Sequence, residues 1–209
     1  MEFVEFESNR ERALIELFGA LEGRYGPNYE CKYYPCHFEG QDCSFCFCPF
    51  YPCFIYELGY VKKTTKGYVW NCKDCHWIHR KEVVEEVLAE LSGYPRQQLV
   101  EGDWLFFNRI VQRLYYGREV GEVIGKAYSL MGCLEGRECE ESELKFLAVR
   151  LENFEIADVE EVSSQGRLKE LIQEEVILIP LLEDGYLYGF ELEPEQEQEF
   201  SVRGLKCKL

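Results

Sequence analysis

The sequence predicts an α+β protein in two parts: a small cysteine-rich module with flanking helices, and an α+β domain that ends in a β-hairpin. Three observations predict this class. Eight of the eleven cysteines fall within residues 31–75. Segments with a helical repeat of apolar residues lie on both sides of that stretch, and strand-length apolar runs with turn residues follow in the second half. We place the boundary between residues 1–93 and 94–209.

The first predicted helix covers Arg10–Leu21. Its apolar residues recur at the three- and four-residue spacing of one helix face, and Ser8 or Asn9 can cap its first turn. Gly23 and Gly26 end the pattern. We therefore expect a short amphipathic helix immediately before the cysteines.

The stretch Asn28–Gly67 has no regular period. It is rich in cysteine, proline, glycine and aromatic residues. Because such a segment cannot bury a conventional core, we expect bonds to a bound ligand to fix its conformation. Gly67–Trp70 predicts a short strand that leads into Cys72.

Two longer helices are predicted after the cysteines. Trp77–Leu91 carries a helical apolar pattern and is stopped by Gly93 and Pro95. A second amphipathic pattern runs over Trp104–Tyr115 and ends at Gly117.

The second half mixes further helices with strands. Val120–Leu130 also has a helical pattern, although Gly121 and Gly125 weaken it. Gln165–Gln173 predicts a helix between strands.

Strands are predicted at Lys145–Leu151, Val176–Leu181 and Leu187–Leu192. The last two flank Glu183-Asp184-Gly185, and an Asp-Gly pair between apolar runs is typical of a β-hairpin turn. The second part is therefore a small α+β domain with a C-terminal hairpin, and its role is open.

Composition limits the possible partners. The chain has 209 residues, of which 46% are hydrophobic, and a formal net charge of −16. Nearly all of that charge lies outside Arg24–Ser92. Within this segment, 8 Lys and Arg residues nearly balance 9 Asp and Glu residues. A strongly acidic body repels phosphate backbones, which disfavours nucleic acid as a partner. Binding of nucleic acid through the zinc module would require a basic surface, and Lys62–Lys66 is the local basic patch in the sequence. A solvated loop explains this patch more simply.

The chain is expected to stay in the cytoplasm. No apolar run reaches the roughly 18 residues that span a membrane. The acidic start Met1–Arg12 lacks the basic and apolar regions of a signal peptide. In a reducing compartment, clustered cysteines are more often metal ligands than disulfide partners.

The cysteine cluster predicts two metal sites of four thiolates each. The matching spacings favour one division, with Cys43-x2-Cys46 joined to Cys72-x2-Cys75, and Cys31-x4-Cys36 joined to Cys48-x4-Cys53. A histidine could replace one thiolate or orient it by a hydrogen bond. The predicted ligands are Cys31, Cys36, Cys43, Cys46, Cys48, Cys53, Cys72 and Cys75, with His37, His76 and His79 as further ligands or their supporting residues.

Two zinc ions are the first choice for these sites. Structural zinc favours closed tetrahedral thiolate sites and stabilises small folds with thin cores. An iron–sulfur cluster is the alternative, because Cys43–Cys53 is a dense thiolate run with Pro49 and Pro52 among its ligands.

The motifs also carry a family resemblance. The runs CKYYPCH, DCSFCFCPFYPC and NCKDCHWIHR, within about residues 23–91, resemble the archaeal and bacterial family described as a cysteine-rich small domain, a zinc-finger-like probable metal-binding protein. The resemblance implies a metal-binding module whose biochemical role is not established, and it points to a link with corrinoid metabolism. Residues 95–209 resemble no family.

The other three cysteines are not expected to hold metal. Cys133, Cys139 and Cys207 lie far from the cluster in a half that contains no histidine. We expect free thiols or one reversible disulfide there.

No motif for hydrolysis, phosphate binding or dinucleotide binding accompanies the cysteines. The sequence therefore favours a cytoplasmic metal-binding protein that acts as a binding module for a protein or a small molecule, with no enzymatic activity indicated. The alternatives are an iron–sulfur redox or accessory enzyme linked to corrinoid metabolism, and nucleic-acid binding through the zinc module.

Overall fold

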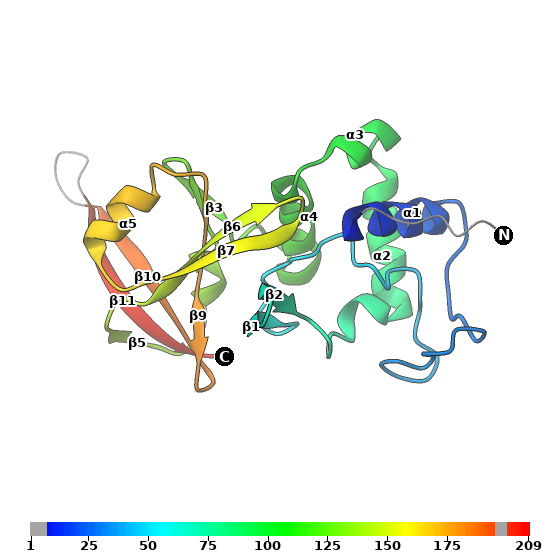
Figure 1. Ribbon diagram of the computed structural model, residues 1–209, viewed down its shortest axis with the longest axis horizontal. Helices are drawn as coiled ribbons and strands as arrows, with labels where there is room; N and C mark the ends of the chain where they lie inside the picture. The colour runs from blue at the N-terminus through cyan, green and yellow to red at the C-terminus, as the bar shows by residue number, and fades with distance from the viewer. Residues whose placement is uncertain (1–7, 195–199) are drawn as a thin grey trace. The chain divides into compact units, whose positions relative to one another are not determined.

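The computed structural model of the chain describes residues 8–194 and 200–209. Most of the acidic amino-terminal stretch considered above therefore lies outside the described residues. The chain is α+β, as predicted, and forms two compact units (Figure 1). The first unit combines the described residues up to Cys53 with Cys72–Gly117, and the second combines Phe54–Asn71 with the described residues from Arg118 onward.

These units differ from a simple division after residue 93. Residues 94–117 belong to the first unit, because the buried Phe107 packs its ring 6.5 Å from that of Phe50 in the cysteine-rich segment. Residues 54–71 belong to the second unit, where their strand β2 (Gly67–Asn71) lies against β7 (Glu155–Val162). Each unit thus contains two separate stretches of chain.

Helices form the regular part of the first unit. Helix α1 (Asn9–Leu21) begins at Ser8, whose hydroxyl accepts a hydrogen bond from the amide of Glu11 while the Glu11 carboxylate accepts one from the amide of Ser8. The predicted helix over Trp77–Leu91 is divided by the extended backbone of Arg80. The resulting elements are η1 (Trp77–His79) and α2 (Lys81–Ser92), followed by α3 (Arg96–Glu101) and α4 (Trp104–Tyr116).

The end of α4 is also as predicted. Gly117 adopts a left-handed backbone with φ 70°, and its amide donates to the carbonyl of Arg113. At the other end, the Asp103 carboxylate accepts from the amide of Phe106.

The cysteine-rich segment of the first unit has few regular elements but buries aromatic side chains. Phe45 and Phe50 are each 1% exposed. Burial of a phenylalanine side chain contributes roughly 1.5–3 kcal/mol. The segment therefore contributes buried aromatic side chains to the core of the first unit, where Phe50 lies near Phe107 of α4.

The second unit is built on sheets. A five-stranded sheet has the order β3-β4-β8-β6-β7, and a four-stranded sheet has the order β5-β11-β10-β9. Helix α5 (Gln165–Leu171) confirms the helix predicted between strands. The remaining elements are β1 (Tyr60–Thr64), β3 (Glu122–Ile124), β4 (Ala127–Ser129), η2 (Met131–Leu134), β5 (Cys139–Ser142), β6 (Phe146–Glu152), β8 (Ile177–Ile179), β9 (Leu181–Glu183), β10 (Tyr186–Pro194) and β11 (Phe200–Lys208).

The predicted Asp-Gly hairpin joins β9 to β10. Glu183 pairs with Tyr186 in antiparallel register, and Asp184 and Gly185 both have positive φ, at 50° and 79°. Two central residues with positive φ give the turn whose twist matches that of paired strands. The predicted strands at 145–151 and 187–192 correspond to β6 and β10, whereas 176–181 is divided between β8 and β9.

The helix predicted over Val120–Leu130 was wrong. The segment forms the β3–β4 hairpin with Gly125 at its turn, where φ is 63° and an added Cβ would lie 2.2 Å from the carbonyl oxygen of Ile172. Strand β4 then pairs in parallel with β8, and Ala127–Ser129 is buried. Sheet pairing and burial thus override the helical spacing of the apolar residues.

Among the helices in residues 8–194 and 200–209, none has the length and apolar character needed to cross a membrane.

Candidate metal centre

The eight clustered cysteines all lie in the first unit as free thiols. The second unit differs, because Cys139 and Cys207 form a disulfide between the paired strands β5 and β11. The buried Cys133 is a free thiol. A disulfide framework therefore does not account for the cysteine cluster.

One group of thiols surrounds Cys46. The pKa of the Cys46 thiol is raised to about 12, first by burial and then by the nearby Glu16 carboxylate and the Cys43, Cys36 and Cys31 thiols. Hydrogen bonds bring three of these cysteines together, because the Gln41 amide contacts the sulfurs of Cys36 and Cys43 and the Cys46 thiol contacts the Cys43 carbonyl. We call Cys31, Cys36, Cys43 and Cys46 site A.

A second group surrounds Cys48. Burial raises the pKa of the Cys48 thiol well above its usual value, with further contributions from Cys53, Cys72 and Cys75. The pKa of Cys72 is raised to about 11, first by burial and then by Cys75. We call Cys48, Cys53, Cys72 and Cys75 site B.

This grouping differs from the division expected from the spacings. The sequence favoured Cys43 and Cys46 with Cys72 and Cys75, whereas the groups that act on the pKa values of Cys46 and Cys48 favour the first four cysteines as one set and the last four as another. The amide of Cys43 donates to the carbonyl of Gly26 at 3.0 Å, which holds the Cys43 turn against the start of the same loop. Tertiary contacts of this kind leave no trace in cysteine spacing.

Tight turns bring neighbouring cysteines together within each site. In site B, the amide of Cys75 donates to the carbonyl of Cys72 at 3.0 Å. In site A, the Cys46 thiol donates to the carbonyl of Cys43 at 3.4 Å. Turns of this kind let the two sulfurs of a Cys-x2-Cys pair approach one ion.

Gln41 is a buried polar residue at site A, and no pattern in the sequence identifies it. Its side chain is fully buried, and its amide nitrogen donates to the sulfurs of Cys36 at 3.1 Å and Cys43 at 3.8 Å. Its amide oxygen accepts from the amide of His37 at 2.7 Å. A buried donor that contacts two sulfurs holds both of them in position as ligands.

All three histidines lie together beside the thiols. The His37 ring stacks on that of His79 with centroids 4.4 Å apart, and the His76 ring lies 5.6 Å from that of His37. The Nδ1 atom of the buried His79 lies 2.9 Å from the carbonyl oxygen of Asp42. Because a carbonyl can only accept, this nitrogen carries the proton. His79 thus fixes the residue that precedes Cys43.

Burial disfavours the charged form of the His79 and His37 rings. Burial lowers the pKa of His79 first, and His76 lowers it further. Burial also lowers the pKa of His37, with additional contributions from His79 and His76.

The thiol and imidazole donor atoms do not converge on a single point. Within residues 8–194 and 200–209, no three His, Cys, Asp or Glu side chains have the mutual arrangement of a preformed metal site. The chemistry of each group nevertheless suits a soft metal ion, because thiolate sulfur is the ligand that such an ion prefers and a bound cation favours the loss of the thiol protons.

The basic patch is not part of either site. Lys62, Lys63 and Lys66 are exposed on the β1–β2 hairpin, which belongs to the second unit.

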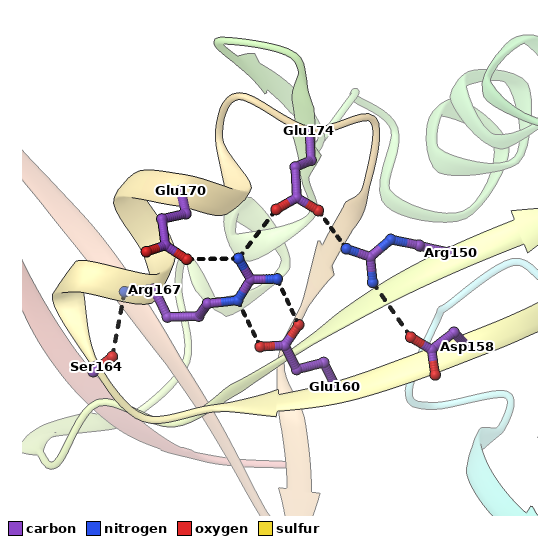
Figure 2. Close-up of polar contacts among 7 residues, drawn as sticks. All are labelled: Arg150, Asp158, Glu160, Ser164, Arg167, Glu170 and Glu174. Carbon is purple, nitrogen blue, oxygen red and sulfur yellow. Dashed lines mark hydrogen bonds and ion pairs between the residues drawn. The ribbon is translucent and has the colours of Figure 1, made fainter.

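The second unit has a charged network of its own, shown in Figure 2. Arg167 binds the Glu160 carboxylate through two hydrogen bonds of 2.7 and 2.9 Å, and it also contacts Glu170 and Glu174. Arg150 connects Glu174 to Asp158. Each arginine is surrounded by carboxylates, so the network joins α5 to the β6–β7 hairpin rather than offering a binding site.

Comparison with known proteins supports the metal-binding assignment. Residues 24–98 match the family described as a cysteine-rich small domain, of zinc-finger-like type. The uncharacterized protein MJ0836 of Methanocaldococcus jannaschii is 44% identical over 99 residues, which cover 47% of this chain and 77% of that protein.

A second relative is a much longer protein. The probable cobalt-factor III C(17)-methyltransferase of Methanothermobacter thermautotrophicus is 52% identical over 67 residues, which cover 32% of this chain and 19% of the methyltransferase. No solved structure matches the chain. With the motif, the thiol groups and these relatives in agreement, the chain belongs to the cysteine-rich small domain family.

Proposed function

We propose that the chain is a cytoplasmic zinc-binding protein that holds one zinc ion in site A and one in site B. The metals are structural, and they order a module that binds another protein or a small molecule. The observation that carries this proposal is that eight free thiols lie in one compact unit, where the buried Gln41 amide contacts the sulfurs of both Cys36 and Cys43.

Four thiolates favour zinc on geometric and energetic grounds. Zinc is bound by four thiolates in closed tetrahedral sites, and its binding energy becomes folding energy for an irregular segment. The cysteine-rich segment consists mainly of turns and bends, and Gln41, Asp42 and Ser44 are buried within it. Clustered cysteines that bind metal are typical of reducing compartments, which supports the cytoplasm.

A closed site argues for a binding role. Four protein thiolates leave zinc no open position for water, so hydrolysis is not part of the proposal. Tyr25, Tyr29 and Tyr33, in the loop that enters site A, are 55%, 72% and 68% exposed. An open pocket of about 550 Å³ lies beside Cys43 and is lined in part by Tyr25 and Tyr29. Tyrosine is enriched in the contact surfaces of proteins, so this loop is where a partner would bind.

Elemental analysis of protein purified without oxygen tests the metal assignment. We expect about two zinc ions per chain and no visible absorption. X-ray absorption at the zinc edge should show about four sulfurs near 2.3 Å. Shorter bonds of about 2.0–2.1 Å would mean that a histidine replaces a thiolate in at least one site.

A second candidate is an iron–sulfur redox or accessory protein linked to corrinoid metabolism. The observation that favours it is the similarity to one segment of a probable cobalt-factor III methyltransferase. Iron with matching sulfide and broad visible absorption in the same sample would establish this candidate in place of zinc.

A further inference from the structure

We propose that four side chains outside the family's matched segment position the metal ligands of site B. These residues are Arg10 and Glu16 of α1, and Trp104 and Asn108 of α4. All four hydrogen-bond to the backbone of Cys46–Cys53, which we call the ligand run. The inference rests on the proposed function, because it assigns these residues a role in metal binding.

The two residues of α1 hold the first half of the ligand run. The Glu16 carboxylate accepts a hydrogen bond from the amide of Phe47 at 2.7 Å. Phe47 stands between Cys46 of site A and Cys48 of site B. The Arg10 guanidinium donates to the carbonyl of Pro49 at 3.3 Å and also to that of Leu99 at 3.3 Å, so it connects the run to α3.

The two residues of α4 hold the second half. The indole nitrogen of Trp104 donates to the carbonyl of Pro52 at 2.8 Å. The side-chain amide of Asn108 donates to the carbonyl of Cys53 at 3.0 Å. Gln112, one turn further along, donates to the side-chain oxygen of Asn108 and so fixes which end of that amide faces Cys53. Asn108 and Gln112 are both 1% exposed.

These contacts matter because the ligand run has no helix or strand to order it. Its backbone consists of turns and bends. Buried backbone groups without partners cost free energy, and side chains fixed on helices satisfy them here. The positions of Cys48 and Cys53 are therefore set by helices that lie 31 to 55 residues away in sequence.

The metal module extends beyond the segment that matches the family. Residues 24–98 match the family, yet α1 begins at Asn9 and α4 ends at Tyr116. Both helices belong to the same compact unit as the eight cysteines. A fragment limited to residues 24–98 would lack all four positioning residues.

The test measures zinc affinity at one site at a time in the full chain. Cys31→Ser removes a ligand of site A and leaves site B, whereas Cys75→Ser leaves site A. In each background, zinc affinity is measured by competition with a chromophoric chelator. Trp104→Phe deletes the indole donor but keeps an aromatic ring, and Asn108→Leu deletes the amide.

Both changes should lower the zinc affinity of site B about 10–100-fold, which is the usual effect of losing a group that supports a metal ligand. The zinc affinity of site A should change less than about twofold in the same variants. Glu16→Met should weaken zinc binding, and Glu16→Gln, which keeps an oxygen acceptor, should restore it. Ile15→Ala is the matched control, because this α1 side chain is 54% exposed.

The outcomes separate the two proposals. Equal weakening of both sites by Trp104→Phe and Asn108→Leu would show a general loss of stability and overturn the positioning role. Unchanged zinc affinity of site B would also overturn it, while leaving the proposed function intact. If neither single-site background binds zinc before these changes, the proposed function itself fails, and the positioning role fails with it.

Discussion

The side-chain amide of Gln41 donates a hydrogen bond to the sulfur of Cys36 at 3.1 Å from a fully buried position. The same side chain accepts from the amide of His37, so its orientation is fixed at both ends. Gln41 therefore stabilises site A from within the loop that carries the ligands, whereas site B is held by residues of α1 and α4.

Replacement of Gln41 should weaken zinc binding at site A. Gln41→Met keeps the length of the side chain but removes the donor to the sulfurs, so the zinc affinity of site A should fall about 10–100-fold. Chelator competition in the Cys75→Ser background measures this. Glu39→Ala, a change at an exposed neighbour in the same loop, is the control. If site A binds zinc with the same affinity with and without Gln41→Met, this role of Gln41 is ruled out.

The Cys139–Cys207 disulfide should affect the stability of the second unit without affecting metal content. The two residues are 68 positions apart, and a disulfide that closes a loop of this size typically contributes about 2–4 kcal/mol. Cys139→Ala combined with Cys207→Ala should lower the unfolding free energy of β10 and β11 by that amount, as measured by hydrogen exchange in denaturant. Loss of a zinc ion from this double variant would contradict the assignment of metal to the first unit alone.

The Arg167 network should make the second unit sensitive to acid. Hydrogen bonding to Arg167 is the main cause that lowers the pKa of Glu160, and Arg150 is the main cause that lowers the pKa of Glu174. Because the folded pKa lies below the unfolded value of about 4.3, the stabilisation is complete above that value and is lost as the pH falls through the folded pKa.

Arg167→Met should return the pKa of Glu160 toward its usual range and leave that of Glu174 still lowered by Arg150. Carboxyl titration by NMR measures both. Arg203→Met, which removes a partner of Glu191 on the other sheet, should leave Glu160 unchanged. A Glu160 pKa that does not rise in Arg167→Met would exclude the hydrogen bonds as the cause of its shift.

Local signals made much of the fold predictable. The capping residues around Ser8, the stop at Gly117 and the Asp184-Gly185 turn each determine a structure through neighbours within a few residues. Other strands were not predicted, because their sequences do not alternate between apolar and polar residues. β7, for example, carries Glu155, Asp158, Glu160 and Glu161 and is mostly exposed or half-buried.

The candidate site was only partly predictable, for a related reason. The eight cysteines are evident because thiolate is an unusual side chain to concentrate in one segment. Their grouping depends on tertiary contacts. The sequence does not determine it, because one Cys-x4-Cys pair and one Cys-x2-Cys pair occur among the first four cysteines and again among the last four. Gln41 and Asn108 have no distinctive pattern in the sequence, and only the sulfur and carbonyl that they contact identify them.

The central claim, that the metal sites follow one another along the chain, is tested most directly by counting zinc in a double variant. Cys43 lies in site A and Cys72 in site B, so Cys43→Ser and Cys72→Ser should each leave about one zinc ion per chain, and the combined variant should leave none. If Cys43 and Cys72 instead share one ion, the combined variant would retain one zinc ion, and this result would contradict the account.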